Sequence, residues 1–350
     1  MNIIIPMAGM GTRLRPHTLT TPKPLIRFAG KAMVEHIIDE IALSLGNGTD
    51  GDNVKIDEIG FVCGHFGEKA EKELIECASA KGAAGHIFYQ DEPLGTGHAI
   101  LCAKPLLHGE VIVAFADTLF TCSEKMLSGN TDAAHSDEQA EVVIFTSKVK
   151  NPQAFGVVIT DETGHINGFM EKPQVFISDE AIIGIYYFRD GGILCAELQN
   201  LIDNDFRHGK EYQLTDALEN MLKKNISFVK ASVKEWLDCG NKDATINAHS
   251  HLLEQKPNLH YVSQDVTVSN SEIIRPCYIA DGVILEDAVI GPFVSLEKKS
   301  TVKKSTLKHS IVQEETIIEN SILTKSMLGI RTVVKNHNGE ISIGDYSEVV

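Results

Sequence analysis

Short runs of β-branched and aliphatic residues alternate with helix-like segments over the larger, N-terminal part of the chain. The runs that predict strands cover residues 2–7, 58–64, 86–90 and 110–117. The segments between them that carry the apolar spacing of a helix cover residues 32–45, 67–82 and 97–107. Strand and helix in repetition predict a parallel sheet with helices on both faces, in which ligands bind at the carboxyl ends of the strands.

A second group of elements follows, and its order is less regular. The expected strands cover residues 140–149, 155–173 with a hairpin turn near Glu162 to Gly164, 181–188 and 228–240. The expected helices cover residues 193–203, 215–225 and 243–256. Pro257 marks the predicted boundary between a domain of residues 1–256 and a domain of residues 257–350. Two polar stretches, 46–53 and 128–139, predict surface loops.

From about Tyr261 the helical period disappears and single aliphatic residues recur every five or six positions. They are Ile279, Ile284, Ile290, Val302, Leu307, Val312, Ile318, Leu323, Leu328 and Val334. This step is typical of a hexapeptide β-helix, in which each turn stacks one aliphatic side chain on the next. A β-sandwich of short strands is the alternative, but its turns would be spaced about 8–12 residues apart. The predicted fold is α/β, with a Rossmann-like mixed, mostly parallel sheet with helices on both faces and a C-terminal left-handed parallel β-helix-like domain.

The composition is that of an ordinary globular protein, with 43% hydrophobic and 23% charged residues among 350. The formal net charge of -16 argues against binding to nucleic acids or anionic membranes. No apolar stretch approaches the roughly 18 residues of a membrane span, and the first residues lack the basic start of a secretory signal, so a cytoplasmic location is expected. The seven cysteines form no C-x-x-C pair, which predicts neither a zinc site nor a disulfide framework.

The first strand runs into residues 8–16, AGMGTRLRP, and TPKPL follows at 21–25. Glycines at 9 and 11 let the backbone approach an anion closely, and Arg13 and Lys23 add positive charge. The stretch is neither a Walker loop nor the dinucleotide fingerprint, because G-K-[ST] and G-x-G-x-x-G are both missing. Without those cations, a tight strand-to-helix turn would explain the glycines equally well, and Arg15 is equally consistent with a surface charge.

The stretch GMGTRLRPHTLTTPKPL resembles the opening motif of the sugar-1-phosphate nucleotidylyltransferases, G-x-G-T-R-L-x-P followed by P-K-P-L or a close variant. The resemblance continues in the family's order through QDEPLGTGHAI, VIVAFADTLF, AFGVV, FMEKP, GIYYF and EWLDCG, and it covers residues 1 to about 250. It implies that a nucleoside triphosphate and a sugar-1-phosphate react to an NDP-sugar and pyrophosphate, as in nucleotide-sugar and polysaccharide biosynthesis. It also implies in-line attack on the α-phosphorus, without a covalent enzyme intermediate.

Two polyanions meet in such a reaction, so the enzyme needs cations and a metal to offset their repulsion. Asp117 and Asp238 each end a predicted strand, and paired carboxylates suit Mg²⁺, although either alone could be a turn residue or a helix N-cap. By resemblance, these two aspartates hold Mg²⁺. The resemblance also implies that Arg13 grips the β- and γ-phosphates and that Lys23 lies nearer the reacting centre.

The resemblance assigns further residues to each substrate. The residues implied in nucleotide binding are Ala8, Gly9, Gly11, Thr12, Arg13, Gln90 and Gly95, with Gln90 and Gly95 at the base. The residues implied in binding the sugar phosphate are Gly156, Glu171 and Lys172. The implied catalytic residues are Arg13, Lys23, Asp117, Lys172 and Asp238. In isolation the Glu171–Lys172 pair would read as a solvated charge pair, and Gly156 as a strand bulge.

The substrates are less sharply indicated than the reaction. We expect dTTP and glucose-1-phosphate, chiefly from the overall texture of the sequence. Mannose-1-phosphate and GTP are the alternative, because residues 22–25 (PKPL) are closer to a pattern that guanylyl-transferring enzymes share with long thymidylyl-transferring relatives. Ile182 and Ile183 also depart from the family pattern before G-I-Y. A non-catalytic regulatory subunit is a further alternative, although such proteins should have lost the charged site residues.

The remaining histidines and the repeat region suggest little additional chemistry. His249 and His251 lie on a predicted surface helix at a spacing that cannot share one face, so we expect them to be solvated. Acyl transfer through His309 or His337 is conceivable, but neither has a recognisable context. An oligomerising or regulatory role is expected for the β-helix, and a homo-oligomer for the protein.

Overall fold

The computed structural model describes residues 1–46, 55–121 and 140–350. The polar stretches 46–53 and 128–139 therefore lie outside the described residues, apart from Gly46. The described residues form two compact units, Met1–Gly9 with Ile37–Trp236 and Met10–His36 with Leu237–Val350. None of the described helices is long and apolar enough to cross a membrane.

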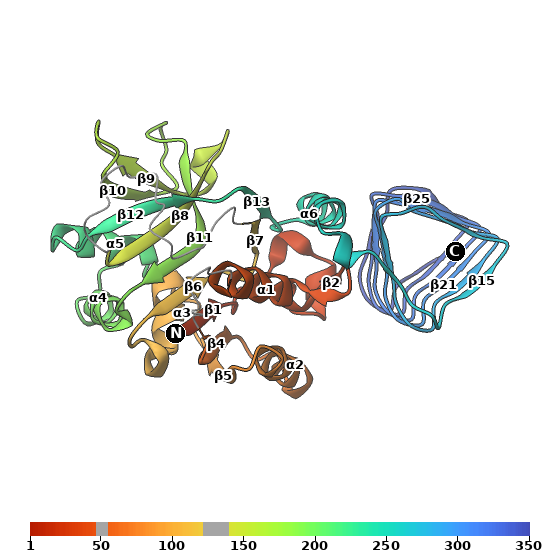
Figure 1. Ribbon diagram of the computed structural model, residues 1–350, viewed down its shortest axis with the longest axis horizontal. Coiled ribbons are helices and arrows are strands. Elements are labelled where there is room, and N and C mark those ends of the chain that lie inside the picture. The colour runs from red at the N-terminus through yellow and green to blue at the C-terminus, as the bar shows by residue number, and fades with distance from the viewer. Residues whose placement is uncertain (47–54, 122–139) are drawn as a thin grey trace. The chain divides into compact units, whose positions relative to one another are not determined.

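The first unit is built on a mixed sheet of nine strands (Figure 1). The strands are β1 (Asn2–Pro6), β4 (Glu58–Cys63), β5 (Ala84–Tyr89), β6 (Val111–Ala114), β8 (Val142–Lys148), β9 (Gly156–Thr160), β10 (Ile166–Glu171), β11 (Glu180–Phe188) and β12 (Phe228–Ser232). Their order is β10-β9-β11-β6-β1-β4-β5, and β8 joins β11 and β12. The strands β6, β1, β4 and β5 run parallel, whereas β11 is antiparallel to its neighbours. The hairpin of β9 and β10 was predicted from the turn residues.

Helices cover both faces of this sheet, as predicted. They are α1 (Met33–Gly46), α2 (Glu68–Ser79), α3 (Thr96–Cys102), α4 (Gly191–Asp203) and α5 (Leu214–Lys223). A Cβ built on Gly60 of β4 would lie 2.7 Å from Leu106, just after α3, and one on Gly85 of β5 would lie 3.0 Å from Ala78 of α2. Gly60 pairs with His86, the residue after Gly85, so the two Cβ directions point to opposite faces.

The helix predicted over residues 97–107 is shorter in the structure. It ends at Cys102, and a 3-10 turn follows over Lys104–Leu106. Pro105 has no N–H to continue the helical hydrogen bonds, which explains the interruption. The extended segment predicted over 228–240 is likewise divided, into β12 and β13 (Glu235–Asp238), and β13 lies beside β7 (Thr118–Thr121).

The C-terminal part of the second unit is a parallel β-helix with three sheets, which confirms the predicted left-handed β-helix-like domain (Figure 1). One sheet holds β14 (Tyr261–Val262), β17 (Cys277–Ile279), β20 (Val294–Leu296), β23 (Ser310–Val312), β26 (Met327–Leu328) and β29 (Ser342–Ile343). The next holds β15 (Thr267–Ser269), β18 (Ile284–Glu286), β21 (Thr301–Lys303), β24 (Ile317–Glu319), β27 (Val333–Lys335) and β30 (Glu348–Val349). The third holds β16 (Glu272–Ile273), β19 (Val289–Ile290), β22 (Thr306–Lys308), β25 (Ile322–Thr324) and β28 (Asn338–Gly339).

Aliphatic side chains stack in columns along the inside of the β-helix. Leu285, Val302, Ile318 and Val334 pair in register from strand to strand, and each is 0% exposed. Nine of the ten predicted aliphatic residues are buried in this core. The prediction was wrong at Ile284, which points outward because side chains alternate along a strand, and Leu285 takes the inward position.

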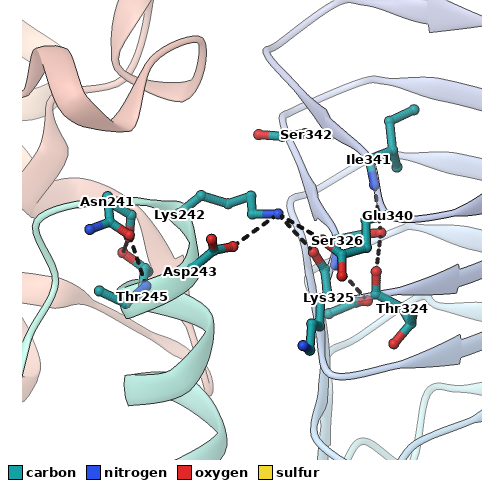
Figure 2. Close-up of polar contacts among 12 residues, drawn as sticks. Asn241, Lys242, Asp243, Thr245, Thr324, Lys325, Ser326, Glu340, Ile341 and Ser342 are labelled. Atoms are coloured by element: carbon teal, nitrogen blue, oxygen red, sulfur yellow. Dashed lines mark hydrogen bonds and ion pairs between the residues drawn. The ribbon is translucent and has the colours of Figure 1, made fainter.

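The segment Met10–His36 packs on the β-helix together with α6 (Lys242–Gln255). The amide of Ala29 donates to Ser295 Oγ at 2.8 Å, and Gln313 Nε2 donates to the carbonyl of Arg27 at 2.7 Å. At the start of α6, Lys242 Nζ donates to the carbonyl of Lys325 at 3.3 Å and contacts Glu340 at 3.4 Å (Figure 2). A compact unit thus forms from segments far apart in the sequence. The boundary predicted between residues 256 and 257 stays a prediction about which part folds independently.

His249 was expected to be solvated, and this was wrong. It is 0% exposed, and its Nε2 lies 2.8 Å from Ser295 Oγ. Burial, with smaller contributions from His36 and His309, lowers the pKa of His249 to about 3. This face of α6 therefore belongs to the core of the second unit.

Adjacent residues of β25 provide a test of the β-helix core. Leu323 is 1% exposed and Ile322 is 59% exposed. Leu323→Ala should lower the free energy of unfolding by about 2–5 kcal/mol, because it removes a buried side chain from a stacked column. Ile322→Ala should cost about 1 kcal/mol or less. Denaturant titration of both variants measures the difference, and equal losses would contradict the assigned register.

Stability should also depend on pH through His249. Its pKa is about 3 in the folded protein, against 6.5 for the free side chain, so only the unfolded chain binds a proton between these values. The free energy of unfolding should therefore fall as the pH drops from 6.5 toward 3. His249→Gln should flatten this dependence in denaturant titrations at pH 7.5 and pH 5, whereas an unchanged slope would contradict a buried neutral imidazole.

Candidate active site

The loop after β1 begins in the first unit and continues into the second. A Cβ built on Gly9 would meet nothing within 4 Å. Gly11 has φ 56°, and its Cβ would lie 3.0 Å from Lys23 Cβ and 3.1 Å from Thr18 Cγ2. Glycine at 11 is therefore required by a left-handed backbone and by the stem of Lys23, whereas no described residue approaches Gly9 closely enough to require glycine there.

The second unit brings Arg13 close to Asp238. Arg13 is exposed on the 3-10 turn Thr12–Leu14, and Asp238 is the last residue of β13. A Cβ built on Gly240 would lie 2.9 and 3.0 Å from the two carboxylate oxygens of Asp238 and 3.1 Å from Arg13 Nη1. Two predicted site residues more than two hundred positions apart therefore meet at one glycine. Lys23, in contrast, is only 9% exposed.

Asp117 lies in the turn between β6 and β7 of the first unit, at the carboxyl end of a central strand, and is half-buried. The turn is fixed to β11, because the amide of Phe115 donates to the carbonyl of Gly184 at 2.9 Å. Thr118 Oγ1 also donates to the carbonyl of Ile183 at 2.7 Å. The backbone carrying Asp117 is therefore held on both sides by hydrogen bonds to a neighbouring strand.

Gly156, Glu171 and Lys172 form one corner of the first unit, where β9 and β10 pair. Lys172 Nζ lies 3.4 Å from Glu171 Oε1, and a Cβ on Gly156 would lie 2.9 Å from Glu171 Oε2. Lys172 has φ 43°, and its amide donates to the carbonyl of Phe155 at 3.0 Å. The Lys172 side chain is 63% exposed, whereas that of Glu171 is 21% exposed, so the ammonium is the accessible end of the pair.

Thr215 lies in the same corner and was not singled out from the sequence. Its Cγ2 is 3.4 Å from the Cβ position of Gly156, and its buried hydroxyl has no hydrogen-bond partner among the described residues. In the sequence, Thr215 is only the start of an amphipathic helix, so no local signal marked it.

Gln90 and Gly95 are in direct contact, and the fold itself requires glycine at position 95. Gln90 Nε2 lies 3.0 Å from the carbonyl oxygen of Gly95 and 3.1 Å from His98 Nδ1. Gly95 has φ 106°, and a Cβ there would lie 2.6 Å from the carbonyl oxygen of Tyr212. Glycine at 95 therefore permits a close approach of the backbone at Tyr212, and its role at the base stays a prediction. Burial lowers the pKa of His98, which favours a neutral ring as the acceptor.

The predicted site residues divide between the two units. The first unit holds Ala8, Gly9, Gln90, Gly95, Asp117, Gly156, Glu171 and Lys172, and the second holds Gly11, Thr12, Arg13, Lys23 and Asp238. In residues 1–46, 55–121 and 140–350, no group of three or more His, Cys, Asp and Glu side chains converges as a metal site. The donor chemistry of Asp117 and Asp238 still fits Mg²⁺, which takes few carboxylates and completes its shell with water and phosphate oxygens.

Tyr186, which the sequence placed in the core, is 5% exposed and packs edge-on against Phe115 with ring centroids 6.3 Å apart. The six cysteines among the described residues form no disulfide, and Cys122 lies outside them.

Comparisons with known proteins agree with these motifs. The chain is 28% identical over 273 residues to the low-salt glycan biosynthesis nucleotidyltransferase Agl11 of Haloferax volcanii, across 77% of this chain and 71% of that protein. It is 29% identical over 313 residues to the bifunctional protein GlmU of Listeria monocytogenes, across 85% and 62%. It is 33% identical over 188 residues to the mannose-1-phosphate guanylyltransferase catalytic subunit beta of Drosophila melanogaster, across 53% and 47%.

The last two alignments span less than two thirds of those relatives' own length. The family model for nucleotidyl transferases, in contrast, matches residues 2–255, well over half of this chain. This range contains every residue that the sequence motifs assigned to the site. The chain therefore belongs to the nucleotidyl transferase family.

Proposed function

We propose that the protein transfers a nucleotidyl group from a nucleoside triphosphate to a sugar-1-phosphate, with dTTP and glucose-1-phosphate as the preferred pair. The observation that carries the proposal is the meeting of Arg13 with Asp238 at Gly240, in a chain that belongs to the nucleotidyl transferase family. A guanidinium beside a carboxylate supplies a phosphate-binding cation and a potential metal ligand at one place.

In the proposed reaction, a phosphate oxygen of the sugar-1-phosphate forms a bond to the α-phosphorus. The bond from the α-phosphorus to the bridging oxygen breaks, and that electron pair leaves with pyrophosphate. The nucleophile is already an anion, so no base is needed to activate it. Catalysis then depends on positioning and on offsetting negative charge.

The cations are assigned to different parts of the reactants. Arg13 is exposed on its turn, and its planar fork suits the β- and γ-phosphates. The stem of Lys23 is buried against Gly11, which fixes the lysine under the same loop. Lys172, on the first unit, is assigned to the sugar phosphate, and the neighbouring Glu171 accepts hydrogen bonds from sugar hydroxyls.

Asp117 and Asp238 are the residues that would hold Mg²⁺. When bound, Mg²⁺ supplies positive charge that offsets the repulsion between the two phosphate-bearing substrates. Asp117 would contribute its carboxylate from a turn that is hydrogen-bonded to β11, and Asp238 from the end of β13.

The second candidate is mannose-1-phosphate with GTP. It is supported by the similarity to the Drosophila mannose-1-phosphate guanylyltransferase subunit and by the PKPL sequence at residues 22–25. A non-catalytic role is less well supported, because all five charged residues of the implied catalytic set are present.

Pyrophosphate release with Mg²⁺ tests the proposal directly. Each of dTTP, UTP, GTP, CTP and ATP is paired with glucose-1-phosphate and with mannose-1-phosphate. We expect the highest kcat/KM for dTTP with glucose-1-phosphate. A higher value for GTP with mannose-1-phosphate would replace the preferred pair by the second candidate. Folded protein that binds a sugar nucleotide without turnover would instead support the non-catalytic role.

Asp117→Asn should lower kcat by about 100-fold or more, because an amide is a much weaker Mg²⁺ ligand than a carboxylate. The fold should be retained, since the hydrogen bonds of the Phe115 amide and of the Thr118 hydroxyl to β11 are unchanged in this variant. Steady-state kinetics and circular dichroism measure the two effects. Asp203→Asn, on α4, is the matched control, and near-normal activity of Asp117→Asn would refute the metal assignment.

Gly240→Ala should lower kcat/KM by about tenfold or more, because the added methyl group would displace both the Asp238 carboxylate and the Arg13 guanidinium. Both displaced groups are ends of flexible side chains, so the melting temperature should stay near that of the wild type. Gly168→Ala is the control, since its Cβ would make only ordinary contacts of 3.5 Å and longer. Unchanged kinetics of Gly240→Ala would argue against a joint role of Arg13 and Asp238.

A further inference from the structure

The segment Met10–His36 contacts one face of the β-helix at several successive coils. Gly30 packs on the ring of Tyr278 in β17, so closely that no Cβ would fit there. Further along the same sheet, Ser295 of β20 accepts from the amide of Ala29. Beyond β23, Gln313 donates to the carbonyl of Arg27 at 2.7 Å. The segment therefore contacts β17, β20 and the residue that follows β23, which are successive positions along one sheet.

The last coil of the β-helix binds the turn that lies between Arg13 and Lys23. His17 is 4% exposed, and its Nε2 lies 3.0 Å from Ser342 Oγ in β29. Burial lowers the pKa of His17 to about 4, so the ring is neutral at neutral pH. Pro16 packs on Gly344, where a Cβ would lie 3.1 Å from Pro16 Cβ.

Asp345 makes three hydrogen bonds, two of them to this turn. Its Oδ2 accepts hydrogen bonds from Thr20 Oγ1 at 2.5 Å and from Thr21 Oγ1 at 3.3 Å. Its Oδ1 accepts from the amide of Ile330 at 2.8 Å, in the preceding coil. One oxygen therefore anchors the carboxylate within the β-helix, and the other holds the two threonines.

We propose that Ser342 and Asp345 of the last β-helix coil are positioning residues for the nucleotidyl transfer, because they hold the turn at residues 16–21 and thereby place Arg13 and Lys23. This inference rests on the proposed function. Neither Ser342 nor Asp345 touches a reactant in this scheme. The turn is tied to Ser342 at His17, on the side of Arg13, and to Asp345 at Thr20 and Thr21, on the side of Lys23, so its release would let both cations move.

Loss of the contacts between the turn and Asp345 should weaken binding of the triphosphate but not of the sugar phosphate. Arg13 and Lys23 are assigned to the triphosphate, whereas Glu171 and Lys172, assigned to the sugar phosphate, belong to the first unit. The double variant Thr20→Val, Thr21→Val keeps the side-chain shape and removes both hydroxyls. We expect its KM for the triphosphate to rise by about tenfold, with KM for the sugar phosphate unchanged. A general loss of folded protein would lower apparent kcat without this difference.

Two comparison variants sharpen the test. Thr20→Ser with Thr21→Ser keeps both hydroxyls and should restore the wild-type KM. Thr267→Val with Thr301→Val makes the same chemical change on β15 and β21, in another sheet of the β-helix, and should leave both KM values as in the wild type.

Hydrogen–deuterium exchange provides a readout that does not need turnover. The amides of residues 10–26 should exchange faster in the valine double variant than in the wild type and in the control pair. Affinity for dTTP and for GTP with Mg²⁺, measured by calorimetry, should fall in parallel. Faster exchange with unchanged affinity and KM would overturn the positioning role, and unchanged exchange would overturn the contact itself.

Failure of the proposed function would look different. Wild-type protein would then neither release pyrophosphate nor bind dTTP or GTP, whatever the exchange of residues 10–26. That result would remove the role assigned to Ser342 and Asp345 along with the function.

Discussion

The hydrogen bonds of one buried hydroxyl, Ser295 Oγ, join three segments of the second unit that are far apart in the sequence. Ser295 belongs to β20 and is 0% exposed, the amide of Ala29 donates to it, and His249 of α6 bonds to it at 2.8 Å. A buried polar group that loses its hydrogen-bond partner lowers the free energy of unfolding by about 1–3 kcal/mol. Removal of the Ser295 hydroxyl would therefore leave both the Ala29 amide and the His249 imidazole without this partner. The segment Met10–His36, α6 and the β-helix are thereby coupled.

This coupling links the β-helix to the proposed chemistry. The strand β1 delivers the chain to the loop at Gly9 and Gly11, as in other parallel sheets that bind ligands at strand ends. The loop then continues as a segment that is fixed along one sheet of the β-helix, from Tyr278 to Asp345. The β-helix is therefore part of the scaffold that carries Arg13 and Lys23.

Much of the fold could be predicted because apolar residues recur with the period of each structure. The period is two residues in a strand, three to four in a helix, and five to six in the β-helix. Both faces of the sheet and the stacked columns follow from them, and the miss at Ile284 is one position on an alternating strand. The motifs identified the candidate residues. Gly156 and Glu171, which the resemblance assigned to the same substrate, lie in contact with each other. His249 could not be read correctly, because nothing in a helix sequence shows that a neighbouring strand offers Ser295 to a buried imidazole.

By itself, then, the sequence determined the family, the two kinds of architecture and the charged residues of the candidate site. These properties can be predicted from short stretches of sequence, because they depend only on the type and the spacing of neighbouring residues. Only the tertiary structure decided that Arg13 meets Asp238, that Gly95 makes room for the backbone at Tyr212, and that Asp345 binds Thr20. Each of these contacts joins residues that are more than a hundred positions apart, and no pattern within a short window of sequence encodes such a distance in space.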